Sequence, residues 1–255
     1  MAIMTSALEI YEYIDSFAPF DSAMGFDNVG LLVGDMNAKS EKVLLALDIT
    51  SDVIEEAVKK NVSIIVTHHP IIFNPLKKLT ADSLQYKLAR NDITVISAHT
   101  NLDICNGGVN DTLARIIGLS FDVNTNEDCY LTGEIEKAVN CREFADLICN
   151  KIGCKGVRFA EKKGSIKKVT VSCGAGGGNI FEAAAQNSDA FLTGEIKHHE
   201  ILFARENNIA VYDIGHFRSE DIIIDRLVKI FAERFPGTVF EKAESDSEDI
   251  SYYIP

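Results

Sequence analysis

Short apolar runs rich in β-branched residues alternate along this chain with stretches in which apolar residues recur at helical spacing. The runs Val43–Ile49, Ile64–Thr67 and Ile93–Ser97 have the composition of buried strands. Between them, the apolar spacing predicts helices over about residues 52–60, capped by Ser51 or Asp52, and 81–90. Strands that alternate with helices in this way predict an α/β fold with right-handed crossovers and mostly parallel sheets.

The same pattern continues on both sides of this core. Ser6 is placed to cap a first helix that runs to about Ser16 and stops before Pro19. The acidic tail from Glu244 to Asp249 is expected to be loose. The other predicted helices cover about 109–117, 142–152, 180–186, 200–205 and 220–235, and the other predicted strands cover about 31–34, 130–139, 156–160, 168–173, 190–193 and 209–212.

One order of elements occurs twice: a strand, a helix, a strand followed by His-His, a helix, and a strand followed by His-x-x-x-acid. The first copy carries His68-His69 and then His99 with Asp103; the second carries His198-His199 and then His216 with Glu220. This echo predicts two pseudo-symmetric α/β lobes with mostly parallel sheets and a metal cluster in the cleft between them. The polar run at 124–128 suggests lobes of 1–125 and 126–255.

Composition narrows the possible partners. The formal net charge is -13, which argues against a nucleic-acid-binding surface because such surfaces are basic. No apolar run reaches the 18 or so residues of a membrane span, and the first residues lack a basic region before an apolar core. We therefore expect a cytoplasmic protein without membrane contacts, whose six scattered cysteines are reduced thiols.

The histidines carry the chemistry. Pro70 cannot continue a central strand, so His68 and His69 are expected at the carboxyl end of theirs, where α/β sheets bind ligands. Imidazoles together with carboxylates suit zinc, iron, manganese or nickel. Such a mixed set exceeds one tetrahedral site and fits two ions about 3.5–4 Å apart, and an ion of this kind lowers the pKa of a bound water toward roughly 7. His216 and Glu220, four residues apart, share one helix face.

Each of these features also has a purely structural interpretation. A single histidine at a strand end is more often a hydrogen-bonding loop residue than a metal ligand, and Asp103 could be a turn residue. The Gly174–Gly178 run could cradle a phosphate or could be a tight turn, and it lacks the spacing of a P-loop. Glu195 and Lys197 could line a site or a solvated loop. The absence of a Gly-x-Ser-x-Gly motif argues against a serine hydrolase.

The chain resembles a known family at five motifs, in the same order and over nearly its whole length. This family is the GTP cyclohydrolase I type 2 homolog family, also called the Nif-three-like family of dinuclear-metal proteins. The motifs are Asp27-Asn28-x-Gly30-Leu31, Thr67-His68-His69-Pro70, His99-Thr-Asn-Leu-Asp103 with Gly107-Gly108-x-Asn110-Asp111, Thr193-Gly194-Glu195 with His198-His199, and Gly215-His216-x-x-Ser219-Glu220.

The resemblance implies a two-lobed subunit in a toroidal homohexamer, with two divalent metal ions per subunit. It implies metal ligands at His68, His69, Asp103, His216 and Glu220, with His99 beside them or as an alternative ligand. His198 and His199 would line the same cleft. The family name implies hydrolytic opening of the guanine imidazole ring of GTP with release of formate, for which His99 and Glu220 would shuttle protons and Lys197 and Arg218 are candidate phosphate contacts.

Three kinds of function remain open at this point. The first is a metal-dependent hydrolase of a nucleotide or another small substrate. The second is a metal-handling or chaperone protein that carries the cluster as cargo. The third is a regulatory scaffold in which the metal is structural.

Overall fold

A computed structural model describes residues 4–122, 128–154, 156–248 and 250–251. The chain forms two compact units, one made of Met1–Leu102 together with Ile223–Pro255 and the other of Asp103–Ile222. This division differs from the predicted lobes of 1–125 and 126–255, because the chain returns to the first unit after completing the second. The polar run that suggested the earlier boundary lies almost entirely outside the described residues.

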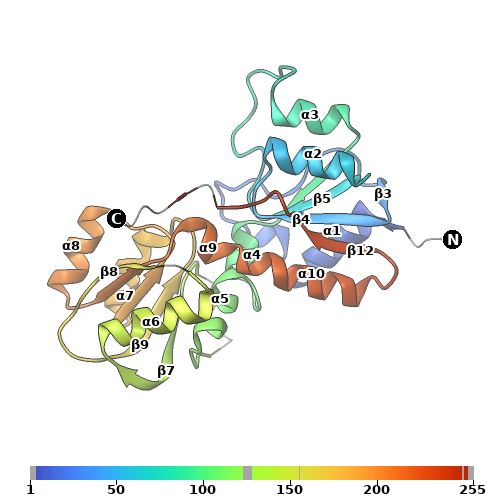
Figure 1. The fold of residues 1–255 in the computed structure, drawn as a ribbon. Coiled ribbons are helices and arrows are strands. Elements are labelled where there is room, and N and C mark those ends of the chain that lie inside the picture. Colours follow the sequence, from blue (N-terminus) through green and yellow to red (C-terminus); the bar gives the residue numbers. More distant parts are fainter. Residues whose placement is uncertain (1–3, 123–127, 155, 249, 252–255) are drawn as a thin grey trace. The chain divides into compact units, whose positions relative to one another are not determined.

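The first unit is built on a five-stranded sheet in the order β12-β4-β5-β6-β2 (Figure 1). Strands β12, β4, β5 and β6 are parallel, and β2 closes one edge in the antiparallel sense. The sequence did not predict β12. Because β12 pairs with β4, the C-terminal segment belongs to this unit. The bounds are β2 (Gly30–Val33), β4 (Lys42–Ala46), β5 (Ile64–Thr67), β6 (Thr94–Ser97) and β12 (Val239–Lys242).

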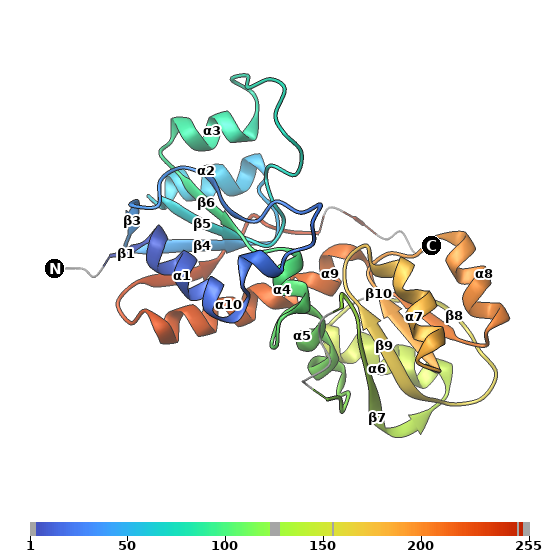
Figure 2. The same cartoon turned by 180° about the vertical axis from the view of Figure 1, so that it is seen from behind.

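Helices cover both faces of this sheet (Figures 1 and 2). On one face, Val53 of α2 (Ser51–Lys59) and Leu88 of α3 (Leu84–Arg90) join a buried cluster with alternate residues of the strands. On the other face lie α1 (Ala7–Phe17) and α10 (Ile222–Arg234), which meet at the Tyr13 and Phe231 rings, 5.7 Å between centroids. Both faces are therefore apolar, as parallel strands require.

Two short features complete the unit. Strand β1 (Thr5–Ser6) pairs with β3 (Lys39–Ser40), and a 3-10 turn spans Phe20–Ser22. Ser6 caps α1 through a reciprocal capping box, as predicted. Helix α2 is capped by the Thr50 side chain instead of Ser51 or Asp52, because the helix begins one residue earlier than the apolar spacing suggested.

The second unit has a five-stranded sheet in the order β7-β9-β10-β11-β8, in which β9, β10 and β11 are parallel and both edges are antiparallel. Helices α7 and α8 pack on one face through a buried cluster around Phe191, and α5 and α6 lie on the other. The bounds are α4 (Thr100–Ile104), α5 (Val109–Ile117), β7 (Leu131–Val139), α6 (Cys141–Ile152), β8 (Arg158–Ala160), β9 (Ile166–Ser172), α7 (Ile180–Ala185), β10 (Ala190–Thr193), α8 (His198–Glu206), β11 (Ala210–Asp213) and α9 (His216–Glu220).

The predicted mostly parallel α/β architecture is confirmed, and so is the repeated plan. In each unit three consecutive parallel strands form the centre of the sheet, and an earlier strand pairs with the third in the antiparallel sense. All six cysteines are free thiols. Among the described residues, none of the helices combines the length and apolar character needed to cross a bilayer.

The acidic tail is not loose along its first residues. The Glu56 carboxylate accepts hydrogen bonds from the backbone N–H groups of Glu244 and Ser245, and Asp246 accepts one from the Leu47 N–H. The prediction that the tail is free from Glu244 onward is therefore wrong for these residues, and Asp249 lies outside the described part of the chain. Negative charge misled the prediction because the Asp246 carboxylate accepts a backbone N–H rather than facing solvent, and the backbone at Glu244 and Ser245 is held by Glu56.

We expect Glu56 to make stability depend on pH. Burial alone would raise the pKa of its carboxyl, but hydrogen bonds from Lys60 and Ser245 outweigh burial and lower it from 4.5 to about 2. Stability from this group is therefore present above pH 4.5 and is lost as the pH falls toward 2. Glu56→Gln should cost on the order of 2 kcal/mol at pH 7 in urea denaturation and much less at pH 2.5. Glu55→Gln, in an exposed pair with Lys59, should change little at either pH.

Candidate metal centre

Backbone register places the first histidines at the carboxyl edge of the first sheet. Strand β5 ends at Thr67, and the N–H groups of His68 and His69 continue to donate to the carbonyls of Ala46 and Leu47, at 3.2 and 3.0 Å. Because this pairing persists past the strand end, both residues are held rigidly. His99 follows β6 two residues beyond its end, as the strand-end pattern predicted.

These three histidines form one group. One ring nitrogen from each lies within 4.8 Å of the others. The ring centroids of His68 and His69 are 5.1 Å apart, those of His68 and His99 are also 5.1 Å apart, and those of His69 and His99 are 5.6 Å apart. His68 is fully buried, whereas the His69 and His99 side chains keep 22% and 18% of their surface exposed, so a ligand could approach the group from solvent.

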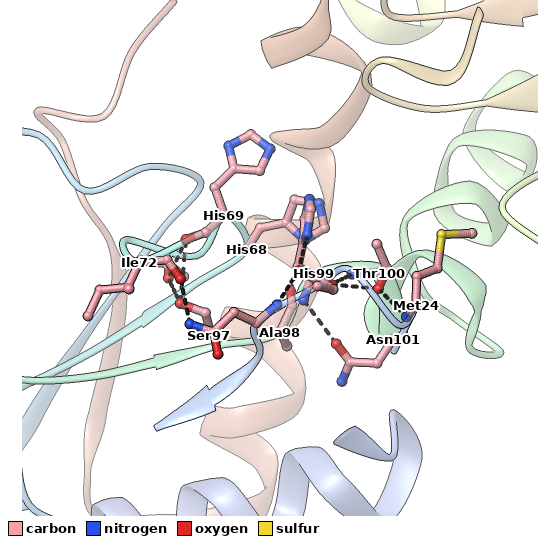
Figure 3. Close-up of polar contacts among 12 residues, drawn as sticks. Met24, His68, His69, Ile72, Ser97, Ala98, His99, Thr100 and Asn101 are labelled. Atoms are coloured by element: carbon pink, nitrogen blue, oxygen red, sulfur yellow. Dashed lines mark hydrogen bonds and ion pairs between the residues drawn. The ribbon is translucent and has the colours of Figure 1, made fainter. Parts of the chain in front are cut away.

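Each ring of this group is oriented through its Nδ1 atom; Figure 3 labels the three histidines and Ala98, the partner of His68. The Nδ1 of His68 lies 2.9 Å from the Ala98 carbonyl oxygen, that of His69 lies 2.8 Å from Asp48 Oδ1, and that of His99 lies 2.9 Å from Asp27 Oδ1. A carbonyl or carboxylate oxygen only accepts, so Nδ1 carries the hydrogen. In the neutral ring the Nε2 atom then bears the lone pair that a metal ion requires.

Asp27 is the most enclosed of these partners, with a side chain that has no exposed surface. Besides His99, its carboxylate accepts hydrogen bonds from the backbone N–H and the hydroxyl of Thr100, the first residue of α4. Burial favours the neutral acid, but the bonds from His99 and Thr100 outweigh it and hold the pKa of Asp27 well below its usual range. The group therefore stays anionic and fixes both the ring and the start of the helix.

The second unit holds a histidine–carboxylate pair on α9. His216 Nε2 and Glu220 Oε2 are 3.0 Å apart, and His216 Nδ1 donates to Glu195 Oε1 at 2.7 Å. Two neighbouring ligands that each lie about 2.1 Å from a metal ion are separated by about 3.0–3.4 Å. The spacing between Nε2 and Oε2 matches that requirement, and the Glu220 side chain is only 5% exposed.

Two further residues of the second unit belong to this neighbourhood. Cys173 is buried, and burial together with the carboxylates of Glu220 and Asp103 raises the pKa of its thiol well above the usual value. Asn110 links the same elements, since its side chain donates to the Asp103 carbonyl at 3.2 Å and accepts from the Cys173 N–H at 2.9 Å. Asp103 and Glu220, two members of the predicted ligand set, therefore both lie beside one buried thiol, whose position here the sequence pattern did not indicate.

The glycine run at 174–178 packs against α9. A Cβ atom on Gly174, whose φ is +57°, would lie 2.0 Å from Glu220 Oε1 and 3.2 Å from His216 Nε2. A Cβ on Gly176 or Gly177 would overlap the side chains of Ser172 or Glu200. The run starts a 3-10 turn before α7, and close packing within the chain explains the glycines at 174, 176 and 177. Of the two predicted roles, the structure favours the tight turn.

The repeat aligns differently from the prediction at its histidine pairs. The hydroxyl of Thr67 donates to the carbonyl of His69, and the hydroxyl of Thr193 donates to the carbonyl of Glu195 in the same way. Glu195 therefore occupies the position of His69. His198 and His199 come later, exposed on the first turn of α8, and among the described residues of their unit they join no group of metal-type side chains. The expectation that they line the site receives no support.

Sequence reasoning missed Asp48 and the role of Asp27 as ring partners. Asp48 follows an apolar run just as His68 does, but the strand predicted over Val43–Ile49 includes it. Glu195, predicted either to line a site or to lie in a solvated loop, is 59% exposed and is also hydrogen-bonded to His216. Of the predicted phosphate contacts, Lys197 is exposed and Arg218 half-buried.

The donor set fits a divalent transition metal. Neutral imidazoles with lone pairs at Nε2 and carboxylates fixed by neighbours are the ligands that zinc, iron, manganese and nickel accept. The carboxylate or carbonyl behind each ring is the arrangement found behind metal-binding histidines. The residues around each half of the predicted ligand set therefore support metal binding.

Asp48→Asn tests this orientation. The amide can place its NH₂ toward His69 Nδ1 and favour the other tautomer, which moves the lone pair away from Nε2. We expect about 10–100-fold weaker metal binding, measured by competition with a chromogenic chelator. Asp52→Asn, on the exposed start of α2, is the matched control and should bind like the wild type. Equal affinity for both variants would show that Asp48 does not orient a ligand.

Comparison with known families gives one consistent result. Residues 5–249 match the family model described as Duf34/NIF3 (NGG1p interacting factor 3). The chain is 33% identical to a Clostridium perfringens protein named GTP cyclohydrolase 1 type 2 homolog, covering 96% of this chain and 98% of that one. It is 36% identical to the protein of the same name from Clostridium acetobutylicum, covering 83% and 84%.

Solved structures are similar to this chain over nearly its whole length. The crystal structure of the hypothetical protein SA1388 from Staphylococcus aureus superposes with a TM-score of 0.90 at 28% identity, covering 97% of this chain and 99% of that one. Reduced HcgD from Methanocaldococcus jannaschii superposes with a TM-score of 0.82 at 30% identity, covering 96% and 100%.

Proposed function

The chain belongs to the Duf34/NIF3 family, and from that membership we propose that it binds two divalent metal ions and hydrolyses a nucleotide or another small molecule. The proposed ligands are His68, His69, Asp103, His216 and Glu220. His99 is proposed to hold or move a proton at its Nε2 atom, and Glu220 at its carboxylate.

The observation that carries this proposal is the orientation of the imidazole rings. His68, His69, His99 and His216 each have Nδ1 bonded to an oxygen of the chain, in two separate units of the fold. Structural histidines satisfy whichever nitrogen is convenient, so a uniform Nδ1 pattern indicates that Nε2 has a common purpose. Metal coordination requires that lone pair at His68, His69 and His216, and proton transfer requires it at His99.

The two points at which the chain passes from one unit to the other fall close in sequence to proposed ligands. The chain leaves the first unit between Leu102 and Asp103, so the ligand Asp103 is four residues from His99 and shares the short helix α4 with Thr100. It returns between Ile222 and Ile223, three residues after Glu220. Each of the two chain segments that connect the units therefore lies within a few residues of a proposed ligand.

A divalent ion bound here would act as a Lewis acid and lower the pKa of a water molecule. The chain's own residues supply the rest of the reaction. Asp27 and Asp48 keep His99 and His69 in one tautomer, and the low exposure of Glu220 strengthens its interactions with a substrate proton. The relatives named GTP cyclohydrolase 1 type 2 homolog make GTP the first substrate to assay.

Metal content tests the ligand assignment. We expect about two divalent ions per chain by elemental analysis of protein purified without added metal. His68→Ala and Glu220→Gln should each lower that content, whereas His199→Ala, on an exposed and unrelated surface, should leave it unchanged. Less than one ion per chain, equal in all four proteins, would overturn the assignment.

Turnover is tested separately on the metal-loaded protein. Formate release from GTP that disappears in His68→Ala and after chelation would support the hydrolase. Stable loading without release of formate or phosphate from any nucleotide, combined with rapid exchange of the ion, would favour the metal-handling alternative. The predicted homohexamer is checked on the same samples by light scattering after size-exclusion chromatography.

A further inference from the structure

Two exposed phenylalanines lie beside the histidine group of the first unit. Phe26 is 62% exposed and Phe73 is 44% exposed, although large aromatic rings are normally well buried. Their ring centroids are 6.1 Å apart with planes tilted by 48°. The Phe73 ring also contacts the His99 ring at 6.3 Å, edge to face. An aromatic surface is therefore continuous with an imidazole of the candidate metal centre.

Both rings are held in place through residues of the site. Phe26 directly precedes Asp27, whose buried carboxylate binds His99 and Thr100. The Asn28 side chain donates to the carbonyl of Ile72, which ties the segment around Phe26 to the segment that carries Phe73 (Figure 3 labels Ile72). The two phenylalanines thus sit on neighbouring segments joined by a hydrogen bond, and neither completes a hydrophobic core.

Resting on the proposed function, we propose that Phe26 and Phe73 bind the flat ring of a nitrogen heterocycle, such as a purine, and present it to the metal centre. A heterocycle offers a π-face that can stack on the phenylalanines. It also offers ring nitrogens that can interact with the neighbouring His99 imidazole. A flat heterocycle can stack its whole π-face on an aromatic ring, which an aliphatic chain or a puckered sugar cannot do. Stacking of a base on an aromatic side chain is worth about 1–3 kcal/mol, so the pair could determine substrate class.

The test uses 2-aminopurine riboside, a fluorescent purine nucleoside that is quenched on stacking. We expect quenching by the metal-loaded wild-type protein, competition by guanosine, and no competition by ribose 5-phosphate. Phe26→Leu and Phe73→Leu keep an apolar side chain but lose the ring, and each should weaken binding by about 5–50-fold. Phe181→Leu, at a ring 49% exposed in the other unit, is the matched control and should bind like the wild type.

Metal content and oligomeric state are measured on every variant to separate the explanations. Normal metal content with weakened purine binding supports the inference. Normal metal content with unchanged purine binding in both phenylalanine variants, or no purine binding by the wild type, overturns it and leaves the proposed metal centre intact. Wild-type protein without metal overturns the proposed function instead. Variants that dissociate an oligomer while binding the purine normally would assign the rings to a contact between copies, which also overturns the inference.

Discussion

Replacing Gly174 with alanine is expected to abolish metal binding at His216 and Glu220. The added Cβ would lie 2.0 Å from Glu220 Oε1, so the carboxylate has to leave its position. The residue also has φ +57°, which costs a non-glycine residue roughly 1 kcal/mol. Because Ser219 accepts a hydrogen bond from the Gly174 N–H at 2.8 Å, movement of the turn would disturb α9 as well.

The control for this variant lies four residues away in the same turn. A Cβ on Gly178 meets nothing within 4 Å, so Gly178→Ala should keep the wild-type metal content and melting temperature. Elemental analysis and a thermal melt on both variants distinguish the two effects. A Gly174→Ala protein that folds and retains wild-type metal content would show that the observed position of Glu220 is not needed for binding.

Replacing Asp27 with alanine is expected to be the most destabilising single change around the histidine group. It removes the acceptor for His99 Nδ1 and for two donors of Thr100, all in a place where the carboxylate has no exposed surface. Stranded buried donors cost about 1–3 kcal/mol each, and some will recover a water molecule, so we expect a total loss of about 3 kcal/mol. Urea denaturation measures it.

Two further variants serve as controls for the stability loss expected in Asp27→Ala. Asp27→Asn keeps an acceptor oxygen of similar shape, so it should recover part of the stability but not the fixed tautomer of His99. Asp21→Ala removes an exposed carboxylate in the neighbouring 3-10 turn and should stay within about 0.5 kcal/mol of the wild type. If Asp27→Ala were equally close to the wild type, the anchoring role inferred from its contacts would be wrong.

The sequence was most informative where local pattern and tertiary position coincide. The run from Ile64 to Pro70 predicted a buried strand followed by two histidines, because an apolar segment, polar ligands and a strand-ending proline are adjacent in the chain. Helix α5 was likewise predicted with its observed bounds. Such features require only a few neighbouring residues to interpret.

Features formed by distant residues were not predictable in this way. Strand β12 pairs with β4 across about two hundred residues of sequence, and nothing in Val239–Lys242 itself identifies its partner. The repeat suggested that His198-His199 corresponds to His68-His69, whereas hydrogen bonding aligns Glu195 with His69. Residue identity alone therefore misplaced the second copy, because the backbone contact that defines the equivalence leaves no trace in the side-chain pattern.

The division of the first unit into two chain segments has a consequence for biosynthesis. Strand β4 is synthesised early, but its neighbour β12 and the covering helix α10 follow only after the whole second unit. At about 5–20 residues per second, the nascent sheet remains for on the order of ten seconds with the β4 edge unpaired and with α1 alone, without α10, on one face. During that interval the second unit, which is continuous in sequence, can fold. The second unit can therefore complete its folding before the first unit, although the first unit begins earlier in the chain.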